Sequence, residues 1–227
     1  MTKFSVITSV YHNDTPDFVR MALDSMLVHQ TLKPSEVVLV RDGVVPDNLE
    51  ALIAEYETMY HDIVHVIRLE KNGGLGKAMK LGVEVAQNDI IARMDSDDIC
   101  SPNRFELQLK YLELHPNVDI IGGQMTEFID TPDNIIGKRI VPCDNEDIYD
   151  FMKNRCALNH VTVMFRKEAV LKVGNYQDWF WNEDYYLWVR MMIAKCKFAN
   201  VPNVLVNVRS GAEYEIGRAV QQECRDR

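Results

Sequence analysis

The sequence predicts an α/β fold with a mostly parallel central sheet and helices on both faces. Over the first half of the chain, short apolar runs typical of buried strands alternate with helical periodicities. Strands that are joined by helices pair in parallel through right-handed crossovers. In addition, Asp95-Ser96-Asp97-Asp98 directly follows the apolar run 90–94. Sheets of this kind bind their ligands at the carboxyl ends of the strands.

The first half is expected to consist of strand and helix pairs. Residues 4–10 form the first expected strand, and Thr15-Pro16 follows with an N-cap residue and a proline at the first helical position. Further strands are expected at 36–40, 63–69 and 90–94, and further helices at 49–60, 75–86 and 102–115. Residues 1–100 therefore are expected to form a nucleotide-binding half.

The second half has a different pattern. We expect strands at 118–123 and 124–129, a turn at 131–134 that leads into 135–141 as a hairpin, a helix at 144–154, a strand at 161–165, an apolar and largely buried helix at 183–194, and strands at 197–201 and 204–208. No linker separates the halves. We therefore expect one domain over 1–210, with a smaller lobe over 101–210, followed by a polar tail at 211–227.

Composition narrows the classes of function. The formal net charge is −9 and the pI is near 5.2, whereas nucleic-acid-binding surfaces are usually basic, so we expect no nucleic-acid partner. The five cysteines are scattered without a C-x-x-C pair, which predicts reduced thiols in a cytosolic protein. Residues 1–3 lead directly into a strand pattern, so we expect neither a signal peptide nor a membrane span. Contact with a membrane surface stays open.

The acidic cluster at 95–98 predicts a site for a metal ion and a diphosphate. Three acids within four residues repel one another, and a hard divalent cation with bound phosphate oxygens would relieve the repulsion. The alternative is that Asp97 and Asp98 cap the helix that follows. Capping accounts for one of the acids and leaves the other two unexplained.

Five motifs in this chain carry a family resemblance. They are the first strand from Phe4 to Tyr11, Asp42-Gly43, the segment from Asn72 to Ala78, Met94-Asp95-Ser96-Asp97-Asp98, and the segment from Asn182 to Trp188. In this order and spacing they resemble a family 2 glycosyltransferase of the GT-A fold, similar to bacterial enzymes of capsule, exopolysaccharide and O-antigen assembly. The resemblance implies transfer of a sugar from a nucleotide diphosphate donor with inversion, using Mg²⁺ or Mn²⁺.

The resemblance implies a nucleotide site at the ends of the strands. The end of the first strand offers backbone groups and an aromatic face for a base, and Asp42 could accept from a pyrimidine N–H or from ribose hydroxyls. We expect the nucleotide to contact Thr8, Ser9, Val10, Tyr11, Asp42, Asn72, Lys77, Asp95 and Ser96. The donor is then a UDP-sugar.

Structural alternatives exist for several of these residues. Asp42-Gly43 could be a plain turn, Tyr11 could be ordinary packing, and Gly73-Gly74 could serve only to turn the chain. The segment 72–78 also lacks the full glycine pattern of a dinucleotide or P-loop site. Lys77 could be a solvated lysine on its helix.

The metal and the acceptor are assigned to different acids. We choose Asp97 as the direct metal ligand, with Asp95 as the second metal-site residue. By the family pattern Asp95 lies nearer the ribose and the water shell of the metal, and Asp98 contacts the sugar or supports the ligands. Magnesium takes only one or two carboxylates in such sites. Inversion requires a base opposite the leaving group, and Asp184 at the start of the apolar helix is the candidate. Capping of that helix by Asn182 or Glu183 is the alternative.

Further contacts to the donor or acceptor sugar are expected from the second half. Residues 179–181, Trp-Phe-Trp, supply flat apolar surface for a sugar ring, and Arg209 could close over the diphosphate. The expected sugar contacts are Asp98, His160, Trp181, Glu183 and Arg209. A structural histidine and a surface arginine are the alternatives for two of them. Trp188, Met191 and Met192 are expected in the core.

Other functional classes fit less well. A nucleotidyltransferase that makes nucleotide sugars normally carries a glycine-rich basic loop after its first strand, and residues 9–14 contain neither glycine nor lysine. A non-catalytic sugar-binding module would not need Asp95, Asp97 and Asp184, and a dehydrogenase would need G-x-G-x-x-G. The resemblance implies a saccharide acceptor or one linked to a polyprenyl diphosphate. The expected location is the cytoplasm, with peripheral contact at the inner membrane face.

Overall fold

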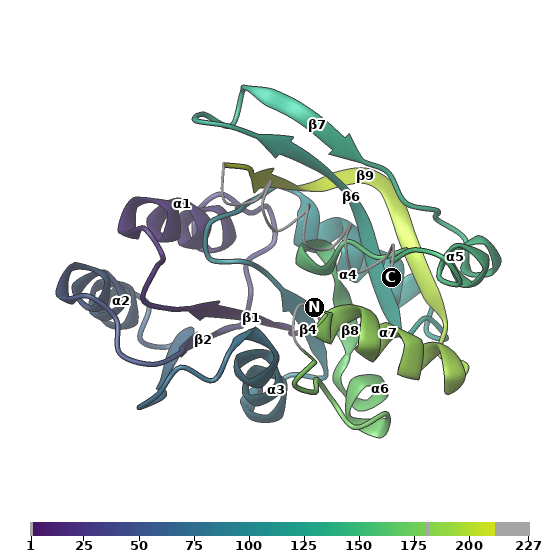
Figure 1. Ribbon diagram of the computed structural model, residues 1–227, viewed down its shortest axis with the longest axis horizontal. Helices are drawn as coiled ribbons and strands as arrows, with labels where there is room; N and C mark the ends of the chain where they lie inside the picture. The colour runs from purple at the N-terminus through teal and green to yellow at the C-terminus, as the bar shows by residue number, and fades with distance from the viewer. Residues whose placement is uncertain (1, 180–181, 212–227) are drawn as a thin grey trace.

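The computed structural model describes residues 2–179 and 182–211 of the 227-residue chain. Within these residues, nine strands form one sheet in the order β3-β2-β1-β4-β8-β6-β9-β5, and β7 pairs with β6 beside this path (Figure 1). Helices lie on both faces of the sheet, so the predicted fold class is confirmed. Apart from Gly211, the predicted polar tail lies outside the described residues.

The first half forms the parallel part of the sheet. Its strands are β1 (Ser5–Val10), β2 (Glu36–Arg41), β3 (Val64–Arg68) and β4 (Ile90–Arg93), and its helices are α1 (Pro16–Leu27), α2 (Asp47–Met59) and α3 (Leu75–Val85). Strand β1 pairs in parallel with both β2 and β4. The carboxyl ends of these three strands therefore lie at the same edge of the sheet, as the alternation of strands and helices predicts.

The second half is mainly antiparallel. Its elements are β5 (Ile99–Cys100), α4 (Arg104–Leu114), β6 (Ile120–Phe128), β7 (Ile135–Arg139), α5 (Asn145–Phe151), the 3₁₀ helix η1 (His160–Thr162), β8 (Met164–Arg166), α6 (Lys167–Lys172), α7 (Glu183–Ile193) and β9 (Phe198–Arg209). Strand β8 is antiparallel to β4 and β6, and the predicted hairpin of β6 and β7 projects at the top of Figure 1. Only β9 pairs with β6 in parallel in this half of the described chain.

Two pairs of predicted strands are in fact single long strands. Residues 118–123 and 124–129 both fall in β6, and 197–201 and 204–208 both fall in β9. The register shifts where Val201 faces Gly123 and Val204 faces Gln124, so that Pro202 and Asn203 stand outside the ladder. A proline is tolerated in a strand at such a bulge because it has no N–H to donate. The sequence break therefore marks a bulge and not the end of a strand.

Other differences are smaller. The strand predicted at 161–165 begins as the 3₁₀ helix η1 and becomes strand only in β8, while α6 and the two-residue β5 had no sequence prediction. Helix α7 buries Leu187, Trp188 and Met191, whereas Met192 is only partly buried and Ile193 is exposed. The prediction of a largely buried helix was therefore too strong.

The alternation of side chains along the strands creates two cores. Val6 and Leu39 face the layer formed by α1, α2 and α4, and Ile7 and Val38 face the layer formed by α3, α5, α6 and α7. Because both faces of β1, β2 and β4 are covered, these strands are continuous apolar runs in the sequence.

A buried polar network joins the two halves of the sheet. Arg104 and Gln108 on α4 have no exposed surface. The Arg104 guanidinium donates to the Arg93 carbonyl at 2.6 Å and to Gln108 Oε1 at 3.1 Å. Gln108 Nε2 donates to the carbonyls of Ile121 at 3.1 Å and Thr162 at 2.7 Å. Helix α4 thus connects the end of β4 to β6 and η1.

We predict that Gln108→Leu lowers the free energy of unfolding by about 3 kcal/mol, because it leaves two buried carbonyls and one guanidinium N–H without their partner. Chemical denaturation with urea measures the change. Lys110→Leu, on the exposed side of the same helix, is the control and should change stability by less than about 0.5 kcal/mol. Equal stability of the two variants would contradict this role of Gln108.

Candidate functional site

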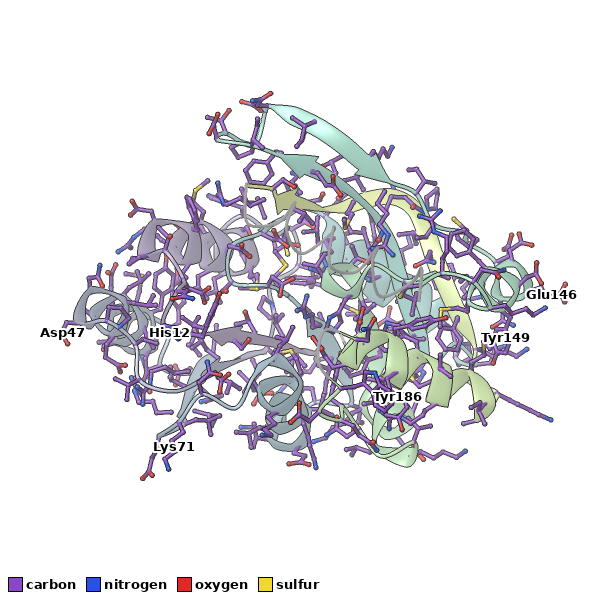
Figure 2. All side chains as sticks on the ribbon, viewed as in Figure 1. His12, Asp47, Lys71, Glu146, Tyr149 and Tyr186 are labelled. Atoms are coloured by element: carbon purple, nitrogen blue, oxygen red, sulfur yellow. The ribbon has the colours of Figure 1, made fainter. Side chains whose placement is uncertain are left out.

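A cavity of about 590 Å³ opens at the carboxyl ends of β1, β2 and β4. Figure 2 labels His12 beside the end of β1, at the edge where these strands finish. The cavity is lined by Ser9, Tyr11, His12, Asp14, Asp42, Asn72, Gly74, Leu75, Gly76, Asp95, Ser96, Asp97, Asp178, Trp179 and Glu183. Residues from all five sequence motifs thus meet in one cavity.

Strand alternation separates the predicted residues of β1. Ser9 and Tyr11 line the cavity, whereas Thr8 and Val10 are buried and do not. Successive side chains of a strand point to opposite faces, so only every second residue can contact a ligand through its side chain. Thr8 and Val10 could reach a ligand only through their backbone.

Asp42 fastens the glycine loop that precedes α3. Its two carboxylate oxygens accept hydrogen bonds from the backbone N–H groups of Gly73 at 2.7 Å and Gly74 at 2.9 Å. Gly43 has φ +86°, and a Cβ at this position would lie 2.6 Å from the Asn72 nitrogen. Asp42-Gly43 is therefore a turn that fits closely against the loop. Each Asp42 oxygen keeps a further lone pair, and the residue lines the cavity.

The acids of the 95–98 segment have different surroundings. Asp95 forms two hydrogen bonds with the guanidinium of Arg93, one of them from Nη1 at 2.6 Å. Asp97 lines the cavity without such a pair. Asp98 is buried and accepts from the Arg209 backbone N–H at 2.8 Å. Asp98 thus holds the end of β9 and lies outside the cavity lining.

The carboxylates of the cavity fit a cation. Burial, with the negative charges of Asp95 and Asp14, raises the pKa of Asp97 to about 6, and burial raises the pKa of Asp14 to about 6. Among the described residues no three histidines, cysteines or acids form a complete metal cluster. A magnesium ion held mainly by phosphate and water needs only one or two carboxylates. Asp97, with the remaining lone pairs of Asp95, meets that requirement.

Two adjacent acids begin α7. Glu183 lines the cavity, and Asp184 is half-buried beside it. Burial raises the pKa of Asp184, while the Tyr185 backbone N–H and the charges of Arg93 and Arg139 oppose this rise. Asn182, the N-cap residue, makes no capping hydrogen bond through its side chain. Burial raises the pKa of Glu183 as well, so the two acids differ in that Glu183 lines the cavity and Asp184 does not.

His160 and Arg209 lie outside the cavity lining. His160 Nε2 is 2.9 Å from the Tyr176 hydroxyl, its ring meets Trp188 edge-on, and burial lowers its pKa well below the usual value. The Arg209 guanidinium lies over the Phe18 ring at 3.7 Å, and its Nε donates to the Asp97 carbonyl at 3.2 Å. Arg209 thus supports the acidic segment, and His160 belongs to an aromatic cluster with Tyr176 and Trp188.

The remaining predictions at the cavity have mixed outcomes. Lys77 forms an exposed ion pair with Asp178 at 3.4 Å. Trp181 lies outside the described residues, but Trp179 lines the cavity and stacks on Tyr186, labelled in Figure 2, with 4.6 Å between ring centroids. Sequence reasoning missed His12, Asp14 and Asp178. The signal for the first two was their position directly after β1, where the chain leaves the sheet.

Comparisons with known proteins give a consistent assignment. The model of the family described as Glycosyl transferase family 2 matches residues 5–180. An uncharacterized glycosyltransferase of Haemophilus influenzae is 42% identical over 92% of this chain and 76% of its own length. The amylovoran biosynthesis glycosyltransferase AmsE of Erwinia amylovora is 40% identical (92% and 77%). The Escherichia coli UDP-Gal:alpha-D-GlcNAc-diphosphoundecaprenol beta-1,3-galactosyltransferase is 36% identical (93% and 75%).

Solved structures share the fold at low identity. Staphylococcus aureus TarS superposes with a TM-score of 0.69 at 18% identity, over 98% of this chain and 39% of that chain. The mannosyltransferase PcManGT of Pyrobaculum calidifontis, in complex with GDP-Man and Mn²⁺, gives 0.71 at 16% identity, over 96% and 61%. This chain thus spans less than two thirds of either structure. The family match and the relatives above 30% identity together show that the chain belongs to the family 2 glycosyltransferases, with the GT-A fold.

Proposed function

We propose that this chain transfers a sugar, with inversion, from a UDP-sugar to a saccharide or polyprenyl-diphosphate-linked acceptor during assembly of a bacterial surface polysaccharide. The observation that carries the proposal is the single cavity that joins the end of β1, the Asp42 turn and the 95–97 acids. One relative is named for amylovoran biosynthesis, and another for transfer from UDP-Gal to a diphosphoundecaprenol-linked sugar. These names support both the donor class and the acceptor class.

The donor would lie along the cavity from β1 to the acidic segment. The base contacts Ser9, Tyr11 and the Asp42 turn, and the ribose and diphosphate lie towards Asp95 and Asp97. A divalent cation, when bound, neutralises the diphosphate and stabilises the charge on the departing nucleotide. Asp97 is the residue we assign as its direct ligand. Asp95, already held by Arg93 on both oxygens, faces the ribose and the water shell.

Asp184 is the proposed base. In an inverting reaction the acceptor oxygen forms a bond to the anomeric carbon as the bond to the nucleotide phosphate breaks, and the hydroxyl proton passes to the base. A raised pKa suits a carboxylate for this role, because it strengthens the carboxylate as a base. Burial acts in this direction at Asp184. Glu183, which lines the donor cavity, is assigned to sugar binding.

The proposed location is the cytoplasmic side of the membrane. No helix among the residues described by the structure is long and apolar enough to cross a membrane. The net charge of −9 provides no general attraction to anionic lipid. Any attachment to the membrane would then come from a local patch, from a partner or from the acceptor lipid itself.

For the donor, we predict that UDP with Mn²⁺ binds at least about ten times more tightly than GDP or CMP, a difference of about 1.4 kcal/mol. The reason is that the β1 end and the Asp42 turn suit a pyrimidine, while the diphosphate reaches the acidic segment. Isothermal titration calorimetry measures the three affinities. Equal or reversed affinities for UDP and GDP would remove the uridine assignment.

For the two acids, we predict opposite effects of two neutral substitutions. Asp97→Asn should abolish the Mn²⁺ dependence of UDP binding. Asp184→Asn should leave UDP binding nearly unchanged yet slow sugar transfer by about 100-fold or more, because proton removal belongs to the transition state. Calorimetry and a transfer assay measure the two properties.

Glu183→Gln is the matched control for the base, since it neutralises the neighbouring acid of the same helix turn. It should slow transfer less than Asp184→Asn does. Transfer at the wild-type rate by Asp184→Asn, or a greater loss in Glu183→Gln, would exclude Asp184 as the base.

For membrane contact, we predict weak, salt-sensitive association that requires acceptor lipid, and no binding to plain anionic vesicles at about 0.15 M salt. Co-sedimentation with vesicles that contain or lack acceptor lipid measures this. Pelleting of most of the protein with acceptor-free vesicles would be inconsistent with attachment through the acceptor.

A further inference from the structure

We propose that Asp14 is a positioning residue that fastens the turn after β1 to the acidic segment through Ser96, and so fixes the spacing between the nucleoside end and the phosphate end of the donor site. This inference rests on the proposed function, because it takes the cavity to bind a nucleoside diphosphate. It concerns a residue that no sequence motif singled out.

One carboxylate oxygen joins two walls of the cavity. Asp14 Oδ2 accepts from the Tyr11 backbone N–H at 3.0 Å and from the Ser96 hydroxyl at 2.9 Å. The Asp14 N–H donates to the Tyr11 carbonyl at 3.1 Å and closes the turn. All three residues line the cavity. The base-side wall and the phosphate-side wall therefore meet at one atom.

This contact lies beyond the end of the strand ladder. The pairing of β1 with β4 extends to Ile7 and Arg93, and the Met94 N–H donates to the Ile7 carbonyl at 3.1 Å. After that point the segments that follow β1 and β4 are no longer paired as strands. They meet again at the contact of Asp14 with Ser96, which are 82 residues apart in the sequence. The side-chain hydrogen bond thus continues the connection between two segments that must hold opposite ends of one ligand.

Ser96 belongs to a segment that is fixed residue by residue. Arg93 holds the Asp95 carboxylate, and Arg209 holds the Asp97 carbonyl and the Asp98 carboxylate. The hydrogen bond from Ser96 to Asp14 connects the acidic segment 95–98 to the turn after β1. Preorganised donors and acceptors bind a charged ligand with less reorganisation, so loss of this hydrogen bond should weaken ligand binding more than it weakens the fold.

A neutral substitution separates hydrogen bonding from charge. Asp14→Asn keeps a carbonyl oxygen that can accept from Tyr11 and Ser96 but removes the negative charge. If Asp14 acts by position, this variant should retain UDP affinity. If Asp14 acts by its charge, for example on a bound cation, it should lose as much affinity as Asp14→Ala.

The test is a double-mutant cycle on UDP binding with Mn²⁺, measured by calorimetry on the whole chain. We expect Asp14→Ala and Ser96→Ala each to weaken UDP binding about tenfold. The double variant should bind UDP within about threefold of either single variant. Asp14→Asn should bind UDP within about threefold of the wild type. Thermal melting of each variant checks that the fold persists.

A matched control is available away from the cavity. The Thr31 hydroxyl donates to the Glu106 carboxylate at 2.7 Å on the exposed surface, so Thr31→Ala removes the same kind of bond and should leave UDP affinity unchanged. Additive losses in the cycle, or equal losses in Asp14→Asn and Asp14→Ala, would overturn the positioning role alone. Failure of the wild-type chain to bind UDP or GDP with Mn²⁺ would overturn the proposed function together with this inference.

Discussion

The Arg104 guanidinium lies in the core with no exposed surface. Burial lowers its pKa, because a charged group is less stable away from water. Its hydrogen bond to the Arg93 carbonyl, at 2.6 Å, fixes the last residue of β4. The Arg93 side chain in turn holds both oxygens of Asp95. A chain of contacts therefore runs from α4 through the strand end to the cavity. A buried cation is retained where its hydrogen bonds define a single arrangement, and here that arrangement is the geometry of the site.

The acidic segment gains its rigidity from three separate elements. Arg93 on β4, Asp14 after β1 and Arg209 on β9 each hold a different residue of it. The Arg209 guanidinium itself lies over the rings of Phe18 and Phe128. Carboxylates that are close together raise one another's pKa and would spread apart if they were free. These contacts keep the acids together before any ligand arrives, which is how a site is preorganised for a cation and a diphosphate.

Sequence patterns predicted the first half of the fold better than the second. Strands buried on both faces, such as β1 and β2, are continuous apolar runs, and the helices between them have clear amphipathic periods. The bulge at Pro202 hid one long strand, and β5 is too short to have a pattern. In the site, motif residues did converge on one cavity, but the contact of Asp98 with Arg209 spans 111 residues of sequence. No local sequence pattern records such a pairing, so the support that Asp98 gives to the end of β9 could not be predicted.

The two acids at the start of α7 differ in their position relative to the cavity, because Glu183 lines it and Asp184 does not. Successive helix residues are about 100° apart around the axis, so their side chains leave the helix in different directions. The charge of Arg93 on β4 acts on both acids, and that of Arg139 on β7 is among the charges that act on Asp184. Arg139 belongs to the second half of the chain, so Asp184 lies within range of a charge from that half. In the inverting reaction that we propose, the base would lie on the face of the sugar opposite the leaving nucleotide, and Asp184, which is outside the cavity lining but adjacent to Glu183, is compatible with that position.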